Sequence, residues 1–94
     1  MNVSDLEEKI IFVLEQYGAD RIGIFGSFAR EEANAESDLD LLVHFKDQQS
    51  LLTLVQIERE LTERTGIKVD LLTEQSVSPY LIDQIKSELK VIYQ

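Results

Sequence analysis

The stretch "GSFAREEANAESDLDLLVHF", residues 26–45, joins a glycine turn to an apolar strand through a strongly acidic segment. Residues 39–45 are apolar at most positions after Asp40, which predicts a strand buried on both faces. Between Gly26 and Asp40 there are five carboxylates and one arginine. Such a segment is either a solvated acidic loop or a binding site for metal ions and a nucleotide. The remainder of the chain has to distinguish these two interpretations.

Helical and strand patterns alternate along the rest of the chain. Apolar residues at helical spacing predict a helix over residues 5–17 and a second that begins after Ser50 and ends at Gly66. Ser78 and Pro79 favour the start of a third helix, because serine caps helices and proline fits their first turn. We expect strands at residues 21–25 and 67–73, and a short helix opened by Ser27. The final "VIY" is compatible with a last strand or with a docked tail.

The lengths of the connections predict the topology. A helix of about four turns separates the strands at 39–45 and 67–73, and such a crossover normally makes two strands parallel. Thirteen residues separate the strands at 21–25 and 39–45, which favours an antiparallel pair. We therefore expect an α/β fold, with a small mixed sheet of three to four strands packed with helices in the order αβ(α)βαβα. The length predicts a single domain over residues 1–94.

Composition limits the classes of partner and the compartment. The formal net charge is −9, so most of the surface should repel phosphate backbones, and direct nucleic-acid binding is not expected. The chain contains no cysteine, which excludes disulfides and thiolate metal sites. The first residues have no signal-peptide pattern and the apolar runs are too short to span a bilayer, so we expect a soluble cytoplasmic protein. An oligomer is compatible with the sequence.

Asp40 and Asp70 interrupt otherwise apolar strands, and Asp38, at the start of the strand at 39–45, is either a turn residue or a third member of the same group. Asp38 and Asp40 are two residues apart, so their carboxylates project from the same face of a strand. Asp70 lies within the strand expected at residues 67–73, beside that pair if the two strands are parallel neighbours. Crowded carboxylates raise one another's pKa, and a divalent cation removes this conflict. Oxygen ligands alone favour Mg²⁺ or Mn²⁺ over Zn²⁺, and two such ions suit a phosphoryl-type displacement.

The residues that follow the strand at 21–25 supply the complementary half of such a site. Gly26 has no Cβ and lets the backbone approach a ligand closely. Ser27 adds a hydroxyl and the free N–H groups of a helix start, which attract phosphate. Arg30, about one turn later, can direct its guanidinium at the same phosphates. Because the segment is so acidic, a nucleoside triphosphate should bind as its Mg²⁺ complex.

These motifs resemble the nucleotidyltransferase superfamily of DNA polymerase beta. "GS", ten residues, "DLD" and a later "VDLL" match its pattern, and the short length resembles its minimal nucleotidyltransferase (MNT) branch. One departure is Glu31, where many members have glycine. Several members of this branch are antitoxins encoded beside a toxin with a HEPN ribonuclease domain.

The resemblance implies a role for each matching residue. Gly26 and Ser27 would hold the triphosphate of ATP, with Arg30 on a phosphate. Asp38 and Asp40 would bind the metal ions, and Asp70 would complete that site or help deprotonate the acceptor. The activity implied is Mg²⁺-dependent transfer of AMP to a hydroxyl, a tyrosine of a HEPN toxin in the antitoxin branch. Two alternatives stay open: a non-catalytic antitoxin that inhibits by complex formation, and transfer to a small molecule.

Other polar residues have plainer interpretations. Glu31, Glu32 and Glu36 are expected to be solvated loop charges. His44 continues the face of the aspartates but is interpreted as a satisfied histidine at a strand end. Tyr80 and Tyr93 are expected to pack or to contact a partner rather than to catalyse.

Overall fold

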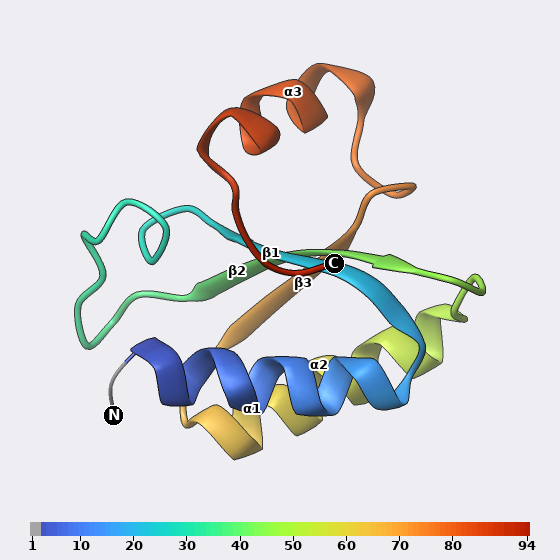
Figure 1. The fold of residues 1–94 in the computed structure, drawn as a ribbon, viewed down its shortest axis with the longest axis horizontal. Helices are drawn as coiled ribbons and strands as arrows, with labels where there is room; N and C mark the ends of the chain where they lie inside the picture. The colour runs from blue at the N-terminus through green and yellow to red at the C-terminus, as the bar shows by residue number, and fades with distance from the viewer. Residues whose placement is uncertain (1–2) are drawn as a thin grey trace.

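The computed structural model describes residues 3–94, with side chains from residue 5 onward, and shows a four-stranded mixed sheet between two layers of helix (Figure 1). Helices α1 and α2 lie together on one face of the sheet, and α3 stands over the other face. The elements in chain order are α1 Val3–Gln16, β1 Ala19–Phe25, β2 Leu39–Phe45, α2 Leu51–Thr65, β3 Val69–Thr73, α3 Pro79–Glu88 and β4 Lys90–Tyr93. The predicted fold class is confirmed.

Local signals set the helix ends that the sequence predicts. The Ser50 hydroxyl caps α2 by accepting a hydrogen bond from the Thr53 backbone N–H at 3.1 Å. Gly66 ends the same helix in the left-handed conformation, with φ 73°, which glycine adopts without steric cost. Ser78 caps α3 and Pro79 occupies its first turn.

The sheet has the strand order β3-β2-β1-β4. β2 and β3 are parallel, whereas β1 is antiparallel to both β2 and β4. Both predicted pairings are therefore confirmed. The ending that the sequence left open is a strand, because β4 completes the sheet along the free edge of β1.

The main core lies between the sheet and the layer formed by α1 and α2. Apolar side chains from alternate positions of the central strands meet the apolar stripes of both helices, as expected for a half-buried helix on a sheet. Its fully buried side chains include Ile10, Leu14, Ile22, Leu39, Leu41, Ile57 and Leu61. This core fixes the strands whose opposite face carries Asp40 and Asp70.

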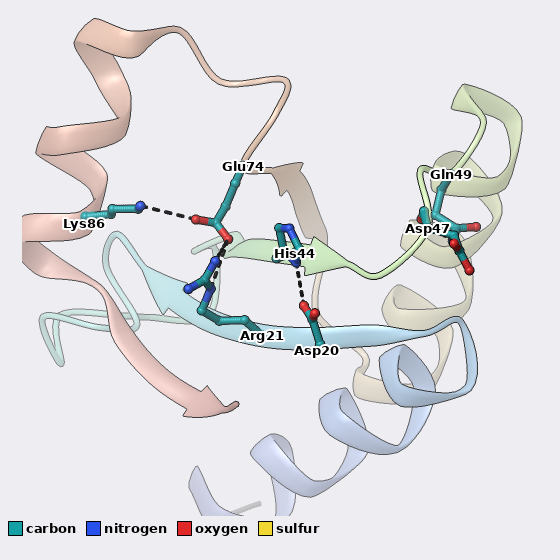
Figure 2. Close-up of polar contacts among 7 residues, drawn as sticks. All are labelled: Asp20, Arg21, His44, Asp47, Gln49, Glu74 and Lys86. Atoms are coloured by element: carbon teal, nitrogen blue, oxygen red, sulfur yellow. Dashed lines mark hydrogen bonds and ion pairs between the residues drawn. The ribbon is translucent and has the colours of Figure 1, made fainter.

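On the opposite face of the sheet, α3 is held by a small apolar contact and by ion pairs of Glu74. Leu89, directly after α3, lies over Gly23 of β1, where an added Cβ would meet Leu89 Cγ at 2.7 Å. The Glu74 carboxylate accepts from Arg21 Nη2 at 2.7 Å and pairs with Lys86 Nζ of α3 at 3.3 Å (Figure 2). Burial raises the pKa of Glu74, but the hydrogen bonds from both cations outweigh it and lower that pKa overall.

The predicted short helix after Ser27 is wrong. Residues 26–31 form turns, in which the Arg30 N–H bonds to the Gly26 carbonyl at 3.1 Å and the Glu32 N–H to the Ser27 carbonyl at 2.8 Å. Glu31 then adopts φ 59°, which ends the coil after one turn. Residues 31–36 are all exposed, as expected for the solvated charges of Glu31, Glu32 and Glu36.

Among residues 3–94, no helix combines the length and the apolar character needed to cross a membrane.

Replacing Gly23 by valine should lower the free energy of unfolding by about 1–3 kcal/mol, because the new side chain overlaps Leu89. Chemical denaturation measures this loss. The double variant Gly23→Val/Leu89→Ala should lose less than the sum of the two single variants, since it removes the overlapping atoms. Additive losses would show that Leu89 does not pack on Gly23.

Candidate active site

The site is built on the parallel pairing of β2 with β3. In this register Asp40 lies directly opposite Asp70, and both side chains are half-buried. They project from the face that α3 partly covers, away from the main core, because their neighbours Leu39, Leu41 and Val69 point into that core. The expected neighbourhood of the two strand aspartates is therefore present.

The close approach of these carboxylates changes the ionisation of Asp40. Burial, the charge of Asp70, the charge of Asp38 and a hydrogen bond with Asp70 together raise the pKa of Asp40, and Arg30 opposes them. A group whose charged form is disfavoured in this way is a candidate functional residue. It is also suited to binding a cation, which removes the repulsion.

Gly26 packs against the Asp40 carboxylate. It has φ 75°, and a Cβ added there would overlap Asp40 Oδ2. Glycine is required at this position for both reasons: the left-handed backbone and the close contact. The turn therefore holds a backbone N–H group within the site, beside the carboxylate pair.

Asp38 has an ion-pair partner outside the Asp40–Asp70 pair. Its Oδ2 lies 3.9 Å from Lys68 Nζ, which precedes β3, and its side chain is 40% exposed. Across residues 3–94, no three His, Cys, Asp or Glu side chains lie close enough together to bind a metal ion as they stand. The expected cluster of three is thus a close pair, and Asp38 lies beside Lys68 instead of completing it. An exposed pair of this length is weak, so Asp38 can leave Lys68 at little energetic cost.

Arg30 and Gly26 share a carboxylate that the sequence did not reveal. Arg30 Nη1 donates to Glu88 Oε2 at 3.2 Å, and the Gly26 N–H donates to Glu88 Oε1 at 3.2 Å. Arg30 Nε also donates to Glu32 at 3.1 Å. Ser27 is half-buried in the same turn. Because Glu88 ends an ordinary amphipathic helix 62 residues after Gly26, no local sequence signal marks it.

The other polar residues singled out in the sequence lie away from the aspartate pair. His44 Nδ1 contacts Asp20 Oδ1 at 2.5 Å (Figure 2), and this hydrogen bond is the main cause of the lowered pKa of Asp20. The interpretation of His44 as a satisfied histidine is confirmed. The Tyr93 hydroxyl donates to Glu15 at 3.1 Å, whereas Tyr80 is 93% exposed on α3.

Paired carboxylates beside a glycine turn, with an arginine one turn later, form a site suited to a phosphate ester and its cations. Comparison with known sequences agrees with this class. The sequence model of the family described as "Polymerase beta, Nucleotidyltransferase" matches residues 8–94. The chain belongs to this family, and the resemblance inferred from the motifs is confirmed.

The chain is similar in sequence to two proteins that are named protein adenylyltransferases and in fold to a toxin–antitoxin structure. A Methanocaldococcus jannaschii protein that carries the provisional name of a protein adenylyltransferase is 46% identical over 88 residues, which are 94% of this chain and 95% of that protein. The protein adenylyltransferase MntA of Thermococcus cleftensis is 36% identical over 75 residues, 80% of this chain and 76% of MntA. A crystal structure of a toxin–antitoxin with AMP-PNP superposes with a TM-score of 0.86 at 26% identity, covering 93% of this chain and 72% of that one.

Changing Asp40 to asparagine should stabilise the protein at pH 7 in the absence of divalent cations. Because the folded-state pKa of Asp40 is raised, the aspartate chain has its full stability below the unfolded pKa, about 4, and loses part of it as the pH rises through the folded value. The melting temperature of the variant should therefore exceed that of the wild type by a few degrees at pH 7.

This difference should vanish as the pH falls below about 4. Asp47, exposed just after β2, provides a matched control in which Asp47→Asn leaves the melting temperature nearly unchanged at both pH values. A destabilised Asp40→Asn variant at pH 7 would contradict the repulsion inferred between Asp40 and Asp70.

Proposed function

We propose that this protein transfers AMP from ATP to a hydroxyl of a partner protein, in a reaction that requires Mg²⁺. The observation that carries the proposal is the position of Asp40 opposite Asp70, with the Gly26 turn packed against Asp40, on a nucleotidyltransferase fold. A purely structural role does not account for two strand aspartates that repel one another. Such unfavourable pairs tend to persist where function needs them.

The donor atoms fit a hard divalent cation. The site offers carboxylate oxygens, with no thiolate in the sequence, and Mg²⁺ typically takes one or two carboxylates together with water and phosphate oxygens. When bound, Mg²⁺ or Mn²⁺ supplies positive charge that stabilises phosphate oxygens during displacement. Asp40 and Asp70 would hold the metal ions, and Asp38 would join them after leaving Lys68.

The glycine turn would hold the nucleotide. In this proposal the Gly26 N–H, the Ser27 hydroxyl and the Arg30 guanidinium contact the triphosphate, since all three are donors beside the carboxylate pair. Bound in this way, the triphosphate presents its α-phosphate to the acceptor. The acceptor oxygen attacks that phosphorus, the bond to the β-phosphate oxygen breaks, and pyrophosphate leaves. Asp70 accepts the acceptor's proton if it is not itself occupied by the cation.

The names of the relatives support a protein as the acceptor. MntA of Thermococcus cleftensis is named a protein adenylyltransferase, and a structural neighbour is a toxin–antitoxin with a bound ATP analogue. We infer that the acceptor is a tyrosine of a HEPN-domain toxin and that the modification neutralises the toxin. The protein would then act as a cytoplasmic antitoxin, with residues 1–94 serving as one nucleotidyltransferase domain.

The test is incubation of a HEPN-domain protein encoded beside this chain with Mg²⁺, ATP and the purified protein. Intact mass spectrometry should show addition of AMP to the partner. Asp38→Asn/Asp40→Asn should reduce this transfer by at least about 100-fold, because it removes two of the three proposed cation ligands while keeping the fold. Asp47→Asn should modify the partner at the wild-type rate.

The alternative of inhibition by complex formation gives a different result. If the double variant no longer adds AMP yet still binds and inactivates the toxin in full, the protein acts as a stoichiometric inhibitor. Absence of AMP addition by the wild type, with a folded protein and the correct partner, would refute the proposed enzyme.

A further inference from the structure

Glu88 occupies the two donors that the proposed function assigns to phosphate. Its Oε1 accepts the Gly26 backbone N–H and its Oε2 accepts Arg30 Nη1, both at 3.2 Å. One carboxylate therefore spans the turn in the two-pronged manner of a bound anion. The side chain is only 34% exposed, so this contact is partly shielded from water.

A carboxylate and a phosphate compete for these donors. The Gly26 N–H has a single hydrogen, and the site already contains the negative charges of Asp40 and Asp70. A triphosphate that approaches Gly26 and Arg30 thus meets an anion that must first move. This competition differs from the ion pair of Arg30 with exposed Glu32, which lies at the edge of the turn.

We propose that Glu88 is a built-in competitor of the nucleotide, whose departure from Gly26 and Arg30 is required for the triphosphate to bind. The proposal rests on the proposed function and adds to it a means of regulation. Glu88 keeps the phosphate donors satisfied when no nucleotide is present, and it lowers the affinity of the site for nucleotide by the strength of its own contacts.

The position of Glu88 links the nucleotide to α3. Glu88 is the last residue of that helix, and Leu89, which lies over Gly23, directly follows it. Two residues earlier, Lys86 pairs with Glu74. When Glu88 leaves the turn, the end of α3 loses one of the contacts that attach it to the sheet. Nucleotide binding and the docking of α3 are therefore coupled with opposite sign.

The test is titration of the purified full chain with Mg²⁺ and AMP-PNP by calorimetry. Glu88→Gln removes the competing charge, and Glu88→Ala leaves both donors open. Each variant should bind AMP-PNP about tenfold more tightly than the wild type, because an ionic hydrogen-bonded contact no longer has to be broken. Hydrogen exchange should also show faster exchange at the end of α3 when AMP-PNP binds to the wild type.

Glu60→Gln provides a matched control. Glu60 pairs with Arg64 at 3.2 Å and has a similar exposure of 30%, but it lies on α2, across the sheet from the site. The Glu60→Gln substitution removes the same charge as Glu88→Gln and should leave the affinity for AMP-PNP unchanged. An equal gain in Glu60→Gln would attribute the effect to net charge and overturn the proposal.

The outcomes separate this proposal from the proposed function. If the wild type binds AMP-PNP and both Glu88 variants, shown to be folded by circular dichroism, bind it equally or more weakly, the competitor proposal is overturned while the nucleotide site stands. If neither the wild type nor any variant binds AMP-PNP, the proposed function fails and the competitor role fails with it. Binding by the Glu88 variants alone supports both.

Discussion

The parallel pairing of β2 with β3 is the constraint on which the site depends. It sets Asp40 opposite Asp70 on the face away from the main core, and it brings Asp38 to the same end of the sheet. The pairing itself is held by the core beneath it, where Leu39, Leu41 and Val69 are almost fully buried. Apolar burial on one face therefore stabilises an unfavourable approach of like charges on the other, where burial first, and then the charges of Asp70 and Asp38, raise the pKa of Asp40.

The two faces of the sheet are stabilised in different ways. One is closed by α1 and α2 over a continuous apolar core. The other is covered in part by α3, which is attached through Leu89, the bridge centred on Glu74 and the contacts of Glu88. Elements held by few apolar contacts open at lower free energy than the core does. The face that carries the candidate site is thus the one whose covering helix, α3, is held by fewer apolar contacts.

Negative charge predominates around the candidate site. The chain has a net charge of −9, and the candidate site adds carboxylates to an already acidic molecule. Gly26 and Arg30 provide the local donors, yet both are engaged by Glu88. A nucleotide accompanied by divalent cations is the kind of ligand that can both neutralise the aspartates and replace Glu88 on the donors.

The sequence alone determined most of the elements and singled out candidate residues for the site. Apolar periodicity, capping serines and connection lengths were sufficient for three helices, for three strands and for the pairing of the central strands, because these depend on local preferences and chain reach. Asp40 and Asp70 were candidates because they interrupt apolar strands, and Asp38 and Gly26 because they flank such strands. Tertiary structure decided the rest: the strand formed by residues 90–93, the turn in place of a helix after Ser27, and the side-chain partners. Lys68 holds Asp38 and Glu88 fills the phosphate donors only because the folded sheet brings distant segments together, and no local pattern encodes such contacts.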